Sequence, residues 1–575
     1  MSTTSSQARA TTPYGQVNNP PIFFKKQNWV LDPFQDTLLI IAAPLLAAGL
    51  ALLIMQHYGA AQGAVLIITT HIILTVAHHL PTFIRIYGDV ELFRRFKWHF
   101  VLGPVVPLVF AAGVLTYINV HQYPVEYFLY LWIFLSLWDP WHFLRQHFGF
   151  MRIYDRHNAA PRLLASRMDW AISGFWFLHI MVASADWLPG LLADLYRSAN
   201  IPLLLALPTG LIPVLHSLTW WLAVSATLVY GGYVLWCFAR GYFVSPAKIA
   251  LLVCTFGVMY FTYTPNEWIL QLVPAWSFKV GFATLGIVHM TQYLAIVWRY
   301  DRRIVEQGRA RNGWFAWLHG RRSRWGIGAA ALVYVGLCIG YGDLLSTRFD
   351  NRWVMSCLLA VGFTSTLLHY YFDGFIWRIR HSQNREALGL RANANAAAGS
   401  SWWDSTRSAT AGGVLLRQLL YFGVPMGLLT WGAIELWQRD SRSYVQQMYH
   451  AQELSQQGEA EAATEMARRA YASMQEELPF AEKMVELRPN TANEAQLAFL
   501  LFNHSLYQNR IMPALEGKPP SPTQHLNHAE QTRLAADLLI NALYRGGSPA
   551  HPGREQLTPE QALQVAQSWE RQLAL

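Results

Sequence analysis

The residues of this sequence best able to do chemistry are histidines that lie within long apolar stretches. Imidazole is the commonest metal ligand in proteins and suits iron, copper and zinc. An ionisable side chain inside an apolar span is costly unless it is paired, so each one marks a candidate functional site. The histidines of this kind are His71, His78, His79, His142, His147, His289 and His369. We predict that they form a metal site.

Polar residues accompany these histidines at helical spacing. Residues three, four or seven positions apart share one face of an α-helix. The pairs with such spacing are His71 with His78, Asp139 with His142, His289 with Gln292, and His369 with Asp373. A polar group beside a ligand histidine either binds the metal itself or orients the ring through a hydrogen bond. We therefore assign Asp139, Asp373 and Gln292 to the catalytic site in one of these two roles.

The four stretches that carry these residues hold their histidines at similar depth. His142 and His289 each precede an arginine by ten residues, His369 precedes one by nine, and His79 precedes one by six. At 1.5 Å per residue, such separations place the imidazoles roughly 9–15 Å inside the basic end of each helix. We expect His78, His142, His289 and His369 to converge, because the ions of a two-metal centre lie about 3.5–4 Å apart.

Basic residues near the same helix ends are candidates for binding a polar substrate head group. A guanidinium group close to the cytoplasmic membrane surface pairs readily with lipid phosphates. The arginines in this position are Arg145, Arg152, Arg299 and Arg378.

The composition indicates that membrane-spanning helices position these residues. Hydrophobic residues make up 53% of the 575 residues and charged residues 14%, whereas a soluble chain carries about 25% charged residues. We predict an all-α, polytopic membrane helix bundle of about eleven transmembrane helices, since each span needs about 20 mostly apolar residues. The expected spans are 37–57, 64–86, 100–120, 124–150, 169–188, 214–238, 247–264, 269–298, 326–346, 353–377 and 411–437.

The distribution of basic residues predicts the orientation of these spans. Lysines and arginines cluster after every even-numbered span and are almost absent from the opposite loops. Cytoplasmic loops carry such an excess, so the polar N-terminal segment 1–36 is expected in the cytoplasm, in a bacterial inner membrane. With an odd number of spans in the membrane domain 37–437, the remaining residues 438–575 lie outside, in the periplasm.

Residues 438–575 are expected to form a soluble helical domain. They are rich in Ala, Glu and Gln and show helical periodicity. The segment Glu486–Pro489 and the following ANEAQLAFLLF resemble the hinge of a tetratricopeptide-type helix pair. This resemblance implies that the domain binds a protein partner or stabilises an assembly.

Other features exclude several classes of function. The net charge of +9 and the pI near 9.3 come from basic loops, so membrane topology explains them and no nucleic-acid partner is expected. None of the four cysteines forms a C-x-x-C pair, which argues against an iron–sulfur cluster or a structural zinc site. Nucleotide-binding motifs such as G-x-G-x-x-G are also absent from the sequence, so a redox enzyme of this kind would need an external electron donor or reductase.

The histidine motifs resemble those of the His-rich membrane oxygenases, namely fatty acid desaturases, fatty acid hydroxylases and alkane monooxygenases. The spacing of His142 and His147 is similar to their first histidine box, and the doublet His78–His79 is similar to the doubled histidine of the others. The resemblance implies two iron ions held at the cytoplasmic side, with oxygen activated against an alkyl chain in the bilayer. We therefore predict a membrane-embedded, metal-dependent oxidoreductase that acts on a lipid or another hydrophobic substrate, with zinc, manganese or copper as alternatives to iron.

Two other functions use the same residues. In a transporter, the buried His and Asp side chains would form a proton relay or a substrate site. In an electron carrier, paired histidines on facing helices would bind haem. The single layer of polar groups argues against the transporter, and the haem hypothesis leaves Asp139 and Asp373 without a role.

Overall fold

The computed structural model describes residues 27–544 except 124, 126–127, 129–130, 185–210, 265–266, 274–275, 377–409, 438–443, 488–490 and 520, together with residues 564 and 568. Every regular element of this described part is a helix, and an isolated antiparallel bridge joins Asp89 to Ala310. The predicted all-α fold is confirmed.

The helices of the apolar part follow one another with short connections. They are α1 (Pro33–Asp36), η2 (Thr37–Ile41), α2 (Ala43–Tyr58), α3 (Ala60–Ala77), α4 (His79–Gly88), α5 (Val90–Arg95), α6 (Lys97–Leu102), α7 (Val105–Val120), α8 (Trp132–Tyr154), η4 (Asp155–His157), α9 (Arg162–Ala183), α12 (Leu211–Ala239), α13 (Pro246–Tyr263), α14 (Glu267–Leu272), α15 (Phe278–Glu306), α16 (Gly313–His319), α17 (Arg324–Ser346), α18 (Arg352–Ile376), α20 (Ala411–Gln418), η6 (Leu419–Gly423) and α21 (Val424–Trp437).

Within the described residues, eight helices are long and apolar enough to cross a membrane. The bent pair formed by Pro33–Ile41 and Ala43–Tyr58 would make a ninth span. Helices α8 and α9, with 23 and 22 residues, have sufficient length but are not apolar enough to qualify. The chain is thus compatible with a multi-pass membrane protein, and the count of eleven spans stays a prediction.

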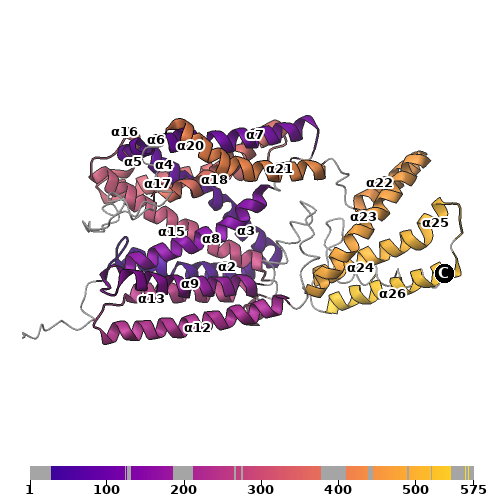
Figure 1. Ribbon diagram of the computed structural model, residues 1–575, viewed down its shortest axis with the longest axis horizontal. Coiled ribbons are helices and arrows are strands. Elements are labelled where there is room, and N and C mark those ends of the chain that lie inside the picture. Colours follow the sequence, from indigo (N-terminus) through magenta and orange to yellow (C-terminus); the bar gives the residue numbers. More distant parts are fainter. Residues whose placement is uncertain are drawn as a thin grey trace, which may run out of the picture.

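The central helix of the bundle is mostly buried, whereas peripheral helices expose apolar side chains. In Figure 1, α7, α20 and α21 lie along the upper side and α9, α12 and α13 along the lower side, with α8 and α15 between them. Of the most apolar stretch of α15, 72% is buried inside the protein, whereas only 22% of the corresponding stretch of α12 is buried. On the periphery, Leu228 of α12 is 72% exposed and Leu332 of α17 is 76% exposed. An apolar surface of this extent fits contact with lipid.

The span that carries the histidine doublet is broken at His78. Helix α3 ends at Ala77, His78 caps it, and α4 begins at His79. Pro81 lies in the first turn of α4. A proline has no N–H to donate and its ring clashes with the preceding turn, so it favours a break at this position. The break lets His78 and His79 both point into the bundle, where they are buried.

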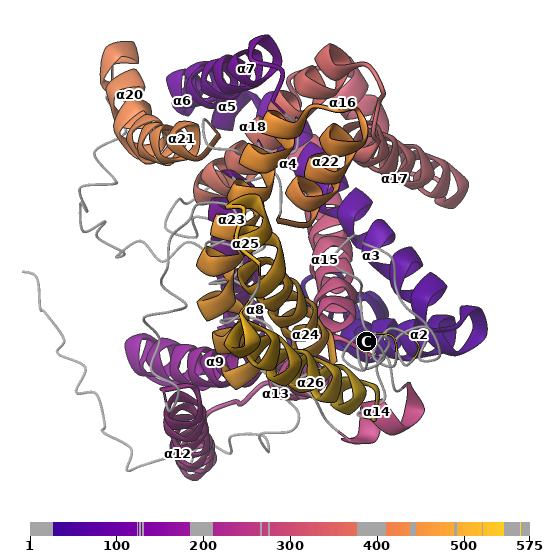
Figure 2. The ribbon, with the colours of Figure 1, turned by 90° about the vertical axis from the view of Figure 1, so that its right-hand side faces the viewer.

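The C-terminal helices build a separate hydrophobic cluster. They are α22 (Tyr444–Gln456), α23 (Ala460–Leu487), α24 (Thr491–Leu506), η7 (Tyr507–Ile511), α25 (Met512–Leu515) and α26 (Pro522–Tyr544). Their cluster draws its buried residues only from the range 444–539. Figures 1 and 2 show these helices beyond the end of the bundle opposite to α5 and α16. The resemblance to a tetratricopeptide unit and the domain boundary at 438 remain predictions.

Candidate metal centre

Four histidines from distant parts of the sequence meet inside the bundle. The Nε2 atoms of His142 on α8 and His369 on α18 are 3.2 Å apart. The ring of His78 lies 4.4 Å from that of His369 and 5.4 Å from that of His289 on α15, centre to centre. The rings of His142 and His289 are 5.1 Å apart. The structure therefore brings together the four side chains whose matched depth suggested convergence.

The cluster contains two groups of side chains with the geometry of a metal site. One group is His78, His142 and His289, and the other is His142, His369 and Asp373. Within each group, the potential ligand atoms all lie within 4.8 Å of one another. The Asp373 Oδ2 atom lies 3.7 Å from His142 Nε2 and 3.9 Å from His369 Nε2. His142 belongs to both groups, so it occupies the middle of the candidate centre.

The hydrogen-bonding state of the rings fits a metal. Among the described residues, His78 Nε2, His79 Nε2 and both ring nitrogens of His289 are buried without a hydrogen-bond partner. Leaving a buried polar atom unsatisfied costs about 1–3 kcal/mol, so such atoms are rare in folded proteins. Coordination of a metal ion by these nitrogens would remove that cost. A purely structural cluster of imidazoles would instead need partners for each of them.

Two hydroxyl groups hold the second candidate group in place. Tyr293 donates a hydrogen bond of 2.6 Å to Asp373 Oδ1. The Thr82 hydroxyl lies 2.9 Å from His369 Nδ1 and 2.6 Å from the Tyr293 hydroxyl. A contact at Nδ1 leaves Nε2 of His369 directed at the centre and holds the orientation of the ring. Sequence reasoning missed both residues, although Tyr293 follows His289 by four positions and Thr82 follows His79 by three.

His79 borders the centre without belonging to either group. Its Nδ1 atom lies 3.2 Å from the Ser365 hydroxyl, and its ring stacks on that of His369 at 4.8 Å. Its free Nε2 atom keeps it available as an additional ligand.

Two further predicted ligands lie apart from the cluster. The ring of His71 packs against Gly286 and lies 5.7 Å from the ring of Phe282. His147 is buried, and its ring lies 4.9 Å from that of Phe256 on α13. The structure does not bring either imidazole into the two candidate groups.

The other two residues assigned to the catalytic site make different contacts. Asp139 accepts a hydrogen bond of 3.2 Å from the Tyr370 hydroxyl. Gln292 donates to the carbonyl oxygen of Ile40 and accepts from Gln146, at 2.9 and 3.2 Å. These bonds join α15 to α8 and to the N-terminal π-helix η2, and the amide of Gln292 is not part of either candidate group.

A large cavity reaches the candidate centre. It has a volume of about 710 Å³ and lies between α8 on one side and α18, α20 and η6 on the other. His142 and Asp373 form part of its wall, beside aromatic residues such as Trp138, Tyr370 and Phe422. Cavities of roughly 300–1,000 Å³ with apolar walls and a few polar groups are typical small-molecule sites. A substrate in this cavity would meet the two candidate ligands directly.

The predicted head-group arginines are placed differently from one another. Arg145 is an exposed residue of the cavity wall. Arg152 also borders the cavity, but two carboxylates already pair with it. Arg299 is half-buried on α15, and Arg378 lies outside the described residues. Arg145 is therefore the best placed of the four to meet a ligand.

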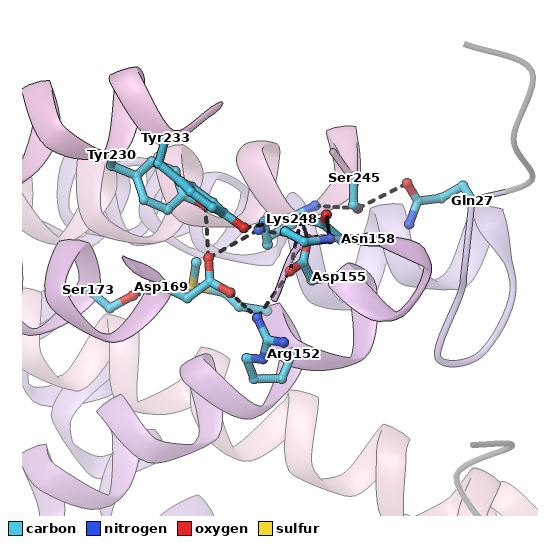
Figure 3. A network of polar contacts seen from close by, with 12 residues as sticks. Gln27, Arg152, Asp155, Asn158, Asp169, Ser173, Tyr230, Tyr233, Ser245 and Lys248 are labelled. Atoms are coloured by element: carbon cyan, nitrogen blue, oxygen red, sulfur yellow. Dashed lines mark hydrogen bonds and ion pairs between the residues drawn. The ribbon is translucent and has the colours of Figure 1, made fainter. Parts of the chain in front are cut away.

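The carboxylates that pair with Arg152 belong to a buried ion network (Figure 3). Arg152 lies 3.0 Å from Asp155 and 2.6 Å from Asp169. Lys248, on α13, contacts the same two carboxylates at 2.8 and 3.1 Å. Tyr230 donates a further hydrogen bond of 3.0 Å to Asp169. Two positive and two negative charges balance, and the network joins α8, α9, α12 and α13 next to the cavity.

We expect Lys248→Met to destabilise the protein by about 3–5 kcal/mol, since removing one partner of a buried pair leaves an uncompensated charge. Lys248 is fully buried, so solvent cannot replace it. Thermal unfolding in detergent measures the effect. The exposed Arg240 at the end of α12 gives a matched control, Arg240→Met, which should unfold like the wild type. Adding Asp155→Asn to Lys248→Met restores the charge balance and should recover part of the loss; no recovery would contradict the electrostatic explanation.

Comparison of the chain with protein-family models, with curated proteins and with solved structures gave no match.

Proposed function

We propose that the protein is a membrane-embedded, metal-dependent oxidoreductase that acts on a hydrophobic substrate held in the cavity beside α8. The observation that carries this proposal is that His142 and Asp373 belong both to the candidate metal centre and to the cavity wall. A metal ion held by these residues would face a bound substrate.

Different residues of the chain would bind the metal, orient its ligands and enclose the substrate in such a site. His78, His142, His289, His369 and Asp373 would hold one ion or a pair, which would supply oxygen activation when bound. Tyr293 and Thr82 orient Asp373 and His369 through the hydrogen bonds described above. Aromatic residues in the wall, among them Trp138 and Tyr370, exclude water and pack against the substrate.

The reaction class is oxygenation or desaturation of an alkyl group, with iron as the favoured metal. A hydroxylation would place one oxygen atom of O₂ in a C–H bond and reduce the other to water with two electrons and two protons. The electrons would come from an external reductase, since the sequence contains no flavin or nicotinamide motif. In this proposal the N-terminus is cytoplasmic, and residues 438–575 lie outside as a partner-binding domain.

The spacing of the rings favours metal ions over haem. A haem plane must fit between its two axial histidines. Ring centres in this cluster are 4.4–5.0 Å from that of His369, for His78, His79 and His142. Such close packing leaves no slot for a porphyrin beside His369.

Metal analysis combined with an optical spectrum of the purified protein tests the proposal. We expect one or two iron ions for each chain and no Soret band. A strong Soret band would establish a haem protein instead. Protein that is folded, yet holds no metal even after incubation with ferrous iron, would contradict the proposal and favour a transporter.

A further inference from the structure

A second group of buried polar side chains extends from the candidate metal centre toward one end of the bundle. We call it the polar seam, and it is formed by α4, α15, α16 and α17. Its members are Thr82, Arg85, Asp89, Tyr293, Tyr300, Asp301, His319 and Tyr334, all of which are buried. Burying this many polar groups in an apolar bundle is costly. The metal centre itself uses only Thr82 and Tyr293 of this set.

The spacing along the two main helices aligns several members of the seam. Thr82, Arg85 and Asp89 follow one another at intervals of three and four residues, so they form one stripe on α4 and its C-terminal cap. Tyr293 and Tyr300 are seven residues apart on α15 and share a face in the same way. The Arg85 guanidinium lies 3.2 Å from the centre of the Tyr300 ring. Helices α4 and α15 pack against each other, so the two stripes face one another.

At one end, the seam joins the metal centre by hydrogen bonds. Tyr293 donates to Asp373, and Thr82 contacts both Tyr293 and His369 Nδ1. At the other end, the seam reaches the surface of the bundle. Arg309 lies 2.6 Å from Asp89 and 2.9 Å from Glu91, whose side chain is 44% exposed.

The middle of the seam contains an Asp–His pair with unsatisfied atoms. Asp301 Oδ2 lies 3.7 Å from His319 Nε2, which is too long for a direct hydrogen bond. Among the described residues, no hydrogen-bond partner is found for either carboxylate oxygen of Asp301 or for either ring nitrogen of His319. The same holds for the Tyr334 hydroxyl. The ring of Tyr334 lies 5.7 Å from that of His319. Buried polar atoms of this kind bind internal water or exchange protons.

The ion network of Figure 3 shows what a static buried cluster looks like in the same protein. There, Asp155 and Asp169 each contact both cations at 2.6–3.1 Å. The Asp301–His319 pair has no contact of this length, although both side chains are fully buried. Stabilisation of the fold therefore explains the first cluster better than the second.

We propose that the polar seam conducts protons between the loop end of α15 and the metal centre. This proposal rests on the proposed oxidoreductase function. In that reaction, two electrons from the substrate and two from the external donor reduce each O₂, and two protons are consumed. Asp301 and His319 receive each proton from the surface end near Asp89 and Arg309. The Tyr334 hydroxyl, which interacts electrostatically with both Asp301 and Tyr293, carries it onward. Thr82 and Tyr293 then pass it along their hydrogen bonds toward Asp373 and His369, so neither hydroxyl has to ionise.

The charges around the pair suit this role. Arg85 of α4 and Asp89, which caps that helix, interact electrostatically with Asp301. Tyr334 of α17 interacts with Asp301 as well. Burial, together with the charge of Arg302, lowers the pKa of His319 to about 3. The imidazole is therefore neutral at neutral pH, and a neutral imidazole has one donor and one acceptor nitrogen. Because the imidazolium is disfavoured, His319 passes a proton only by releasing one from one nitrogen as it accepts another at the second.

The test uses the full-length, metal-loaded protein in detergent. The centre is reduced chemically and mixed with oxygenated buffer, and stopped-flow spectroscopy follows reoxidation of the metal while a pH-indicator dye follows proton uptake. We expect Asp301→Asn to slow both steps on the order of 100-fold, the size typical of positioned proton transfer. Metal content should stay at the wild-type level, and a solvent deuterium effect should grow as proton transfer becomes limiting.

Two variants separate this role from a structural one. Tyr334→Phe removes only a buried hydroxyl and should slow proton uptake while the protein stays folded. Asp343→Asn changes an exposed carboxylate of α17 and should behave like the wild type. Metal-loaded Asp301→Asn and Tyr334→Phe that both take up protons at the wild-type rate would overturn the proton route and leave the metal proposal intact. Wild-type protein without redox-active metal would overturn both.

Discussion

Replacing His142 by alanine is expected to abolish stable metal binding, whereas replacing His147 on the same helix should leave it intact. His142 is the residue common to both candidate groups, and its Nε2 atom lies within 4 Å of His369 and Asp373. Losing a residue that only supports a ligand costs about 10–100-fold in metal affinity. Loss of the central ligand should exceed that range, and elemental analysis of the purified protein measures it.

The control variant His147→Ala removes the same side chain from a buried position five residues further along α8. Its ring packs against Phe256 and lies outside both groups. Both variants remove the same side chain from α8, and only His142→Ala removes a member of the candidate groups. Equal metal content in both variants, at either the wild-type or a reduced level, would contradict the placement of the centre at His142.

The contrast between these two residues shows what the spacing within a short motif leaves open. The pair His142-x4-His147 is similar to a histidine box, which predicts that both residues bind metal. On an α-helix, five residues rotate the side chain by about 500°, which is about 140° past a full turn. A straight helix thus directs the two rings to different faces. Here His142 faces α18 and α15, and His147 faces α13.

The depth of residues in parallel spans predicts which histidines converge in the structure. It depends only on the count of residues to a basic helix end, and it singled out His78, His142, His289 and His369. The reason is physical, because parallel helices of similar length place residues at equal depth in one layer. Depth alone does not tell which face of a helix points inward. His71 lies on the helix that His78 caps, but its ring packs beside Gly286 and belongs to neither candidate group.

Other parts of the site could not be predicted from the sequence. Thr82 and Tyr293 carry no charge, so their burial costs less than that of an ionisable group, and their role depends on which helices pack together. The pairing of Lys248 with Asp155 and Asp169 also depends on packing, since the three residues lie on or beside different helices. The all-helical fold was predictable because apolar stretches longer than about 20 residues permit little else in a membrane.

The second large effect is expected at Asp373. Asp373→Asn keeps the shape of the side chain and removes its charge, and we expect a protein that folds and purifies but binds metal about 10–100-fold more weakly. In the wild type, Asp373 accepts a hydrogen bond from Tyr293 through Oδ1 and directs Oδ2 at His142 and His369. The amide can keep the first contact, but it replaces the anionic ligand with a neutral group. A divalent ion in this buried layer would then lose part of its charge compensation.

Tyr293→Phe distinguishes the charge of Asp373 from its orientation. This variant leaves the carboxylate in place and removes the hydroxyl that holds Oδ1. If Asp373 is a ligand, Tyr293→Phe should lower the metal affinity less than Asp373→Asn does, because the anionic oxygen remains beside His142. If Asp373 serves only to join α18 to α15, the two variants should lower the melting temperature equally and leave the metal content unchanged. Titration of the metal-free proteins with ferrous iron, together with thermal unfolding of the same samples, separates these two outcomes.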